Sequence, residues 1–182
     1  ALAMSMLFSA VAAADEREIS VEVRAEAADA YDQGTSAYLS ERYELAAHWF
    51  ERAFRLVPTS TALLQAVRAH EKAGDSIRAA NLALQLTDSY PSDERAKQIA
   101  DVVIASVKPV SVMVAVECPT ECTLELDGAL IQHPTFFVTP EVEHSLKAAF
   151  DKGEASAYVQ GAPGDIKAVK LVPPALPAAP PI

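Results

Sequence analysis

The sequence predicts an α + β protein of two domains, in which an N-terminal helical repeat precedes a small antiparallel β-sandwich. The spacing of apolar residues is the first observation, because it changes from three or four positions before Val107 to every second position after Pro109. The second is a repeat of 33 residues, seen in the spacing of Pro58 and Pro91. The third is the length of 182 residues, which is enough for two small cores.

Composition and charge exclude several classes of partner. The chain is 51% apolar and 22% charged, as expected of a globular protein, and its net charge is −10. Neither half carries the basic stripe that nucleic acids or anionic membrane surfaces require. We therefore expect a protein or peptide partner, or a cell-wall component, and no nucleic acid.

The first residues, "ALAMSMLFSAVAAADERE", resemble the second half of a secretory signal peptide. Ala12 and Ala14 would occupy the small-residue positions before a cut, so that residues 1–14 are a signal remnant and Asp15 is the new N-terminus. The run is shorter than the roughly 20 residues of a spanning helix. The alternative is a short buried apolar helix. We interpret the run as a signal for export to the periplasm or cell envelope.

Residues 15–107 follow a helical pattern that is interrupted at regular places. Pro58 and Pro91 each end a helical stretch, and Gly74-Asp75 predicts a turn between two helices. The segment "SDERAKQIADVVIASV" predicts a terminal helix with Ser92 or Asp93 as its N-cap. Such a helix would cap two repeats, whose outer apolar face is otherwise exposed.

This pattern resembles the tetratricopeptide (TPR) repeat. The residues that carry the resemblance are Gly34, Tyr43, Ala46, Phe50, Ala53 and Pro58 in the first repeat and Gly74, Ala79 and Pro91 in the second. Three positions depart from the family pattern: Glu41 replaces a turn glycine, and Ala83 and Leu86 replace an aromatic and a small residue.

The resemblance implies a concave groove, lined by the first helix of each repeat, that binds protein or peptide. The positions it assigns to this groove are Tyr31, Asp32, Thr35, Tyr38, Gln65, Arg68, Glu71 and Lys72. The alternative is that Tyr31 and Tyr38 only pack the N-terminal helix. The carboxylate clamp of chaperone-type members is not expected, because Tyr31, Thr35 and Gln65 stand where those members have lysine and asparagine.

Residues 110–172 predict six short strands. Val110, Val112, Val114 and Val116 share one face of the first, and Asp127-Gly128 predicts a turn after the second, which contains Cys122, Leu124 and Leu126. The other expected strands are 135–138, 144–150, 155–160 and 166–172. Residues 173–182 are a proline-rich tract that predicts a semi-rigid linker.

This part resembles the PEGA family, small β-sandwich domains of bacterial envelope proteins. The valine-rich first strand, Asp127-Gly128, Thr139-Pro140 and His144 carry the resemblance. Of the four residues that give the family its name, only the proline is present, as Pro119 in the segment 119–122.

Cys118 and Cys122 are the only cysteines, and they flank a three-residue loop. We predict that they face each other across a hairpin and form a structural disulfide, worth about 2 kcal/mol for so short a ring. Export would place them in an oxidising compartment. Free buried thiols, a redox-active pair and a metal site are the alternatives.

We identify no catalytic residue, cofactor or metal site. The histidines, His48, His70, His133 and His144, are scattered, and the chain has neither a phosphate-binding glycine loop nor a Gly-x-Ser-x-Gly elbow. The sequence therefore predicts an exported, non-enzymatic interaction module of the cell envelope. The alternatives are a structural spacer or stalk, and an accessory region of a larger secreted enzyme.

Overall fold

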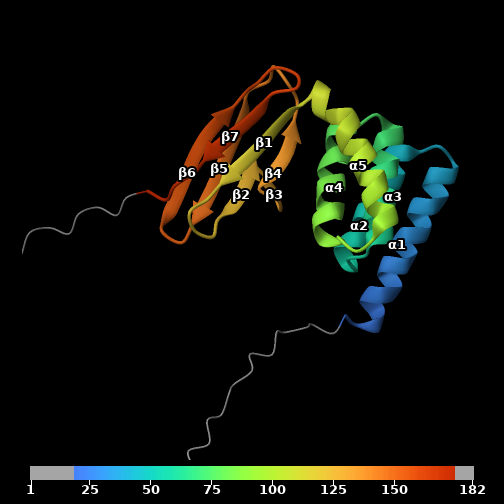
Figure 1. The fold of residues 1–182 in the computed structure, drawn as a ribbon. Helices are drawn as coiled ribbons and strands as arrows, with labels where there is room; N and C mark the ends of the chain where they lie inside the picture. Colours follow the sequence, from blue (N-terminus) through green and yellow to red (C-terminus); the bar gives the residue numbers. More distant parts are fainter. Residues whose placement is uncertain (1–18, 175–182) are drawn as a thin grey trace, which may run out of the picture.

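The computed structural model describes residues 19–174 and shows an α + β protein, with five packed helices followed by two small sheets (Figure 1). The predicted signal remnant and all of the proline-rich tract except Pro173 and Pro174 lie outside the described residues. The helices are α1 (Val21–Leu39), α2 (Tyr43–Leu56), α3 (Ser60–Ala73), α4 (Ser76–Ser89) and α5 (Glu94–Val107).

Local signals set the helix ends. Thr59, Asp75 and Asp93 are N-caps whose side chains accept hydrogen bonds from the backbone two or three residues into the helix. Gly74 ends α3 in the left-handed conformation, with φ of 82°, as the predicted turn requires. Glu41, in the turn before α2, also has a positive φ, 59°. A non-glycine residue in this conformation is strained.

Successive helices pack against each other, and α3 also contacts α5. Gly34 of α1 allows α1 and α2 to pack closely against each other. A Cβ at this position would lie 2.7 Å from Cδ1 of Phe50, whose side chain is only 2% exposed. The second face of that ring meets Tyr31, with 5.2 Å between the ring centroids.

The β region contains seven strands, which form two sheets. The strands are β1 (Val112–Glu117), β2 (Thr123–Leu126), β3 (Ala129–Ile131), β4 (Thr135–Val138), β5 (His144–Phe150), β6 (Gly153–Val159) and β7 (Ile166–Lys170). One sheet has the order β4-β1-β7 and the other β3-β2-β5-β6. Valines 112, 114 and 116 of β1 pack against Leu146 of the opposite sheet and form the core between the two.

Three details differ from the sequence prediction. Strand β3 is a seventh strand, too short to show alternation. The β1–β7 pair is parallel, whereas the sequence indicated only antiparallel strands. Val110 does not share the inner face of β1, because it lies in a 3-10 turn, Lys108–Val110, and is 58% exposed.

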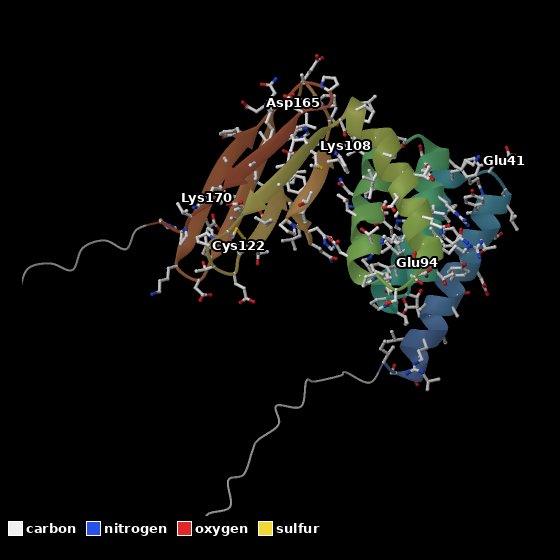
Figure 2. The ribbon with its side chains drawn as sticks, in the orientation of Figure 1. Glu41, Glu94, Lys108, Cys122, Asp165 and Lys170 are labelled. Atoms are coloured by element: carbon white, nitrogen blue, oxygen red, sulfur yellow. A yellow bond between two sulfur atoms is a disulfide. The ribbon has the colours of Figure 1, made fainter. Side chains whose placement is uncertain are left out.

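The cysteines form the predicted disulfide, but they do not face each other across a hairpin. Strand β1 pairs with β4 and β7, and β2 pairs with β3 and β5, so the loop between Cys118 and Cys122 crosses from one sheet to the other. The Cα atoms are 6.4 Å apart, and both side chains pack on the sandwich core. The bond thus closes a corner of the sandwich at the end opposite Asp165 (Figure 2).

Replacing Gly34 with alanine should destabilise the protein by about 1–2 kcal/mol. Alanine favours a helix over glycine by up to about 1 kcal/mol, but the buried Phe50 ring cannot move away from the added methyl group without loss of packing. Urea denaturation of Gly34→Ala should show this loss. The control is Gln33→Ala on the exposed face of the same helix, which should be neutral within about 0.5 kcal/mol. A stabilised Gly34→Ala protein would contradict the close approach of α1 and α2.

Candidate functional site

The helical and β regions meet at a junction between α4 and β4. Asn81 of α4 donates from Nδ2 to the carbonyl of Phe137 at 3.0 Å, and the Phe137 amide donates to Asn81 Oδ1 at 2.7 Å. One side chain thus satisfies both backbone groups of a residue in β4, the edge strand of its sheet. The Phe137 side chain has no exposed surface and belongs to the helical core.

Two more contacts extend the junction along α4. Gln85 Nε2 donates to Gln132 Oε1 at 2.8 Å, and Asp88 Oδ2 lies 3.2 Å from Nδ1 of His133. Positions 81, 85 and 88 share one face of a helix, because they are separated by four and three residues. This polar face of α4 follows the segment that leads from β3 into β4.

A cleft of about 170 Å³ lies beside this junction, between α2 and α4 on one side and the β2–β3 hairpin and β4 on the other. Its lining mixes apolar and polar side chains in similar measure. The lining residues are Glu51, Phe54, Arg55, Arg78, Asn81, Leu82, Gln85, Leu126, Leu130, Ile131, Gln132, His133, Thr135 and Phe136. The helices that line it are the second members of the two helix pairs.

Glu51 is the centre of the charged side of the cleft. Its side chain is 16% exposed and accepts hydrogen bonds from Arg78 at 2.6 and 3.2 Å. His70 Nε2 lies 2.7 Å from Oε1 and donates to it, because a carboxylate can only accept. Burial of the carboxyl raises its pKa, but the hydrogen bonds from His70 and Arg78 outweigh burial and lower the pKa of Glu51 to about 2. In return, the hydrogen bond to Glu51 raises the pKa of Arg78.

Arg55 is the cation that this network leaves most open. Its guanidinium is 3.7 Å from Glu51, and its side chain is 60% exposed. The cleft therefore holds two guanidinium groups around one carboxylate. Two further carboxylates lie next to this lining, since Asp75 acts on Arg78 and Asp88 contacts His133.

The groove residues assigned from the repeat resemblance lie on α1 and α3, away from this cleft. Tyr31 packs on Phe50 and Tyr38 on Tyr43, each with ring centroids 5.2 Å apart, and both are half-buried. Thr35 donates to the Tyr31 carbonyl. The exposed members are Asp32, Thr35, Glu71 and Lys72, and the partly buried ones are Gln65 and Arg68. The prediction that these eight residues bind a partner remains a prediction.

A second hollow, between α1 and the start of α3, includes one of those residues. Tyr31 lines it together with small apolar side chains that include Ala27, Ala53 and Ala62. The other assigned groove residues do not line it.

Three of the four histidines, His70, His133 and His144, lie against carboxylate partners. His144 contacts the Asp127 carboxylate at 2.7 Å through Nδ1 and the Thr139 carbonyl at 3.1 Å through Nε2, which fixes the β2–β3 turn to the start of β5. Among residues 19–174, no group of three or more histidine, cysteine, aspartate or glutamate side chains is placed to hold a metal ion. No helix of the same stretch is both long and apolar enough to cross a membrane.

The chain matches no protein-family model, and it matches no curated protein sequence. The structure alone therefore defines the candidate site. Sequence reasoning missed it because its two sides are about 40 to 85 positions apart in the chain. A partial signal was present, since Asn81 and Gln85 interrupt the apolar pattern of α4 four residues apart.

Replacing Glu51 with glutamine should destabilise the protein at neutral pH by about 2–3 kcal/mol. The pKa of Glu51 is about 2 in the folded protein, against a usual value of 4.5, so its ionisation favours folding above pH 4.5. That contribution should decline as the pH falls from 4.5 toward 2. Urea denaturation at pH 7 and pH 3 should show that the difference between wild type and Glu51→Gln shrinks at the lower pH.

The matched control is Glu26→Gln. Glu26 accepts a 2.6 Å bond from Arg52, but both side chains are more than 40% exposed. Water screens such a pair, so the loss should stay below about 1 kcal/mol. Equal losses for the two variants at pH 7, or a Glu51→Gln effect that does not depend on pH, would contradict the role given to Glu51.

Proposed function

We propose that this protein is an exported, non-enzymatic interaction module of the bacterial cell envelope. Its five helices act as a TPR-like repeat and its two sheets as a PEGA-like domain, and together they bind a protein or peptide partner. The pattern of small residues and prolines supports the first assignment. The valine-rich β1 and the Asp127-Gly128 turn support the second.

Two observations support export. Residues 1–14 have the apolar run and small residues of a signal peptide. The bond between Cys118 and Cys122 is of a kind that persists in oxidising compartments and is rare in the cytosol. Each observation is independent of the other, since one rests on composition and the other on the geometry of a loop.

The observation that carries the binding role is the cleft between the two regions. Next to it, the hydrogen bonds between Asn81 and Phe137 join the helices to the sheet. A preformed cleft lined by apolar side chains and a few polar groups is the usual form of a recognition site. The surface of α1 and α3 is a second candidate, because the repeat resemblance assigns its residues to partner binding.

The test is a crosslinked pull-down from membrane and cell-wall fractions with wild type and two surface variants. Arg68→Glu with Lys72→Glu alters the α1–α3 surface, and Arg55→Glu alters the cleft. We expect a protein retained by wild type to be lost with one variant and kept with the other, which identifies the working surface. Retention of no protein by wild type would contradict the proposal and favour a spacer.

A further inference from the structure

The cleft has a free strand edge along its rim. Strand β3 is at the end of its sheet, so one side of its backbone has no partner strand (Figure 1). The residues Leu130 and Ile131 of this strand line the cleft. The Leu130 residue is 69% exposed, so its apolar surface is open to a ligand.

The turn before β3 determines which backbone groups are free. Asp127 and Gly128 have φ values of 51° and 82°, as in the type I′ turn of a two-residue hairpin. The residues that flank such a turn, Leu126 and Ala129, are paired directly and exchange both hydrogen bonds. The next pair, Glu125 and Leu130, is then a pair without hydrogen bonds. The amide and carbonyl of Leu130 therefore point away from β2, toward the open edge.

The size of the cleft limits what it can hold. A typical small-molecule site has about 300–1,000 Å³, whereas a cavity of about 150 Å³ takes a single benzene ring. The observed 170 Å³ is enough for one side chain and too small for a whole cofactor. The ligand should therefore be a polymer that inserts one side chain and continues outside the cleft.

Charge selects among such polymers. Arg78 is already hydrogen-bonded to Glu51, whereas the Arg55 guanidinium lies 3.7 Å from that carboxylate and is exposed, so Arg55 is the group with donors to spare. Arginine pairs well with carboxylates, because its planar donors match the two carboxylate oxygens. Phe54 and Leu130 add apolar surface beside it.

We propose that the cleft binds an extended peptide segment that carries a carboxylate next to an apolar residue. The segment adds to the free edge of β3, where its backbone pairs with Leu130, its carboxylate pairs with Arg55, and its apolar side chain enters the cleft. This is strand addition, in which backbone bonds supply affinity and side-chain contacts supply specificity. The inference rests on the proposed binding function and names the ligand class for one of its two surfaces.

The test uses the 182-residue chain with its disulfide formed and a library of fluorescein-labelled hexapeptides. Each peptide has one aspartate or glutamate flanked by valine, isoleucine or leucine. A matched library has asparagine or glutamine in place of the acid, and a third carries N-methyl groups on alternate backbone nitrogens. Binding is measured by fluorescence polarisation and located by the shifts of backbone amide resonances.

We expect acidic peptides to bind at least tenfold more tightly than their amide counterparts and to shift the Leu130 and Gln132 amides. Arg55→Glu should weaken binding at least tenfold, and Arg55→Gln severalfold. Arg95→Glu, the same charge reversal on an exposed position of α5, should have no effect. N-methylation of alternate peptide nitrogens should abolish binding when the methylated nitrogens are those that face β3, because the peptide then has no N–H groups to donate to that strand.

Three results would overturn the inference. Binding that is indifferent to Arg55→Glu or to N-methylation would exclude the β3 edge. Shifts confined to α1 and α3 would leave the proposed binding function intact and move the site to the other surface. Binding of cell-wall fragments with no binding of peptides would show that the partner is of another class.

Discussion

The arrangement of this protein depends on how a single edge residue, Phe137, is held by the helices. Its ring is fully buried in the helical core, and both of its backbone groups are bound by one side chain, Asn81. An edge strand normally exposes such groups to water or to another strand. Here the Asn81 side-chain amide makes the hydrogen bonds that a neighbouring strand would otherwise make. Helix α4 therefore lies against this edge of the sheet. Leaving either group unpaired in this half-buried place would cost about 1–3 kcal/mol.

This attachment gives the cleft its shape and its chemistry. Because α4 is fixed against β4, the neighbouring helix α2 faces the β2–β3 hairpin, and the two enclose Glu51, Arg55 and Arg78. The ion network formed by α2, α3 and α4 lowers the pKa of Glu51 to about 2, so Glu51 is charged at neutral pH. Glu51 thereby holds the Arg78 guanidinium in place, whereas the Arg55 guanidinium remains open to solvent. The free β3 edge lies on the opposite wall. The helical wall therefore offers a cation, and the other wall offers unpaired backbone groups.

Sequence reasoning reached the fold class, the order of the two regions and most element positions, because these depend on local periodicity. It placed the Gly74 turn and the Asp127-Gly128 turn correctly, and of its two candidates for the α5 cap, Ser92 and Asp93, the structure has Asp93. Each of these features is specified within a few residues. It missed the parallel β1–β7 pair and wrongly drew Cys118 and Cys122 across a hairpin. Strand partners depend on distant segments, which alternation along one strand does not reveal. The cleft was missed for the same reason, because no short motif contains its residues.

The most direct test of this account is whether the two regions tumble as one body, measured by residual dipolar couplings of backbone amides in wild type and Asn81→Leu. Leucine has the same branching at Cγ and the same number of heavy atoms as asparagine but makes no hydrogen bond, so the Phe137 backbone groups lose both partners. The account predicts one alignment tensor for both regions in wild type and in a Gln85→Ala control. In Asn81→Leu it predicts two tensors, or a reduced alignment of the β region. Separate tensors in wild type, or a single tensor unchanged in Asn81→Leu, would contradict it.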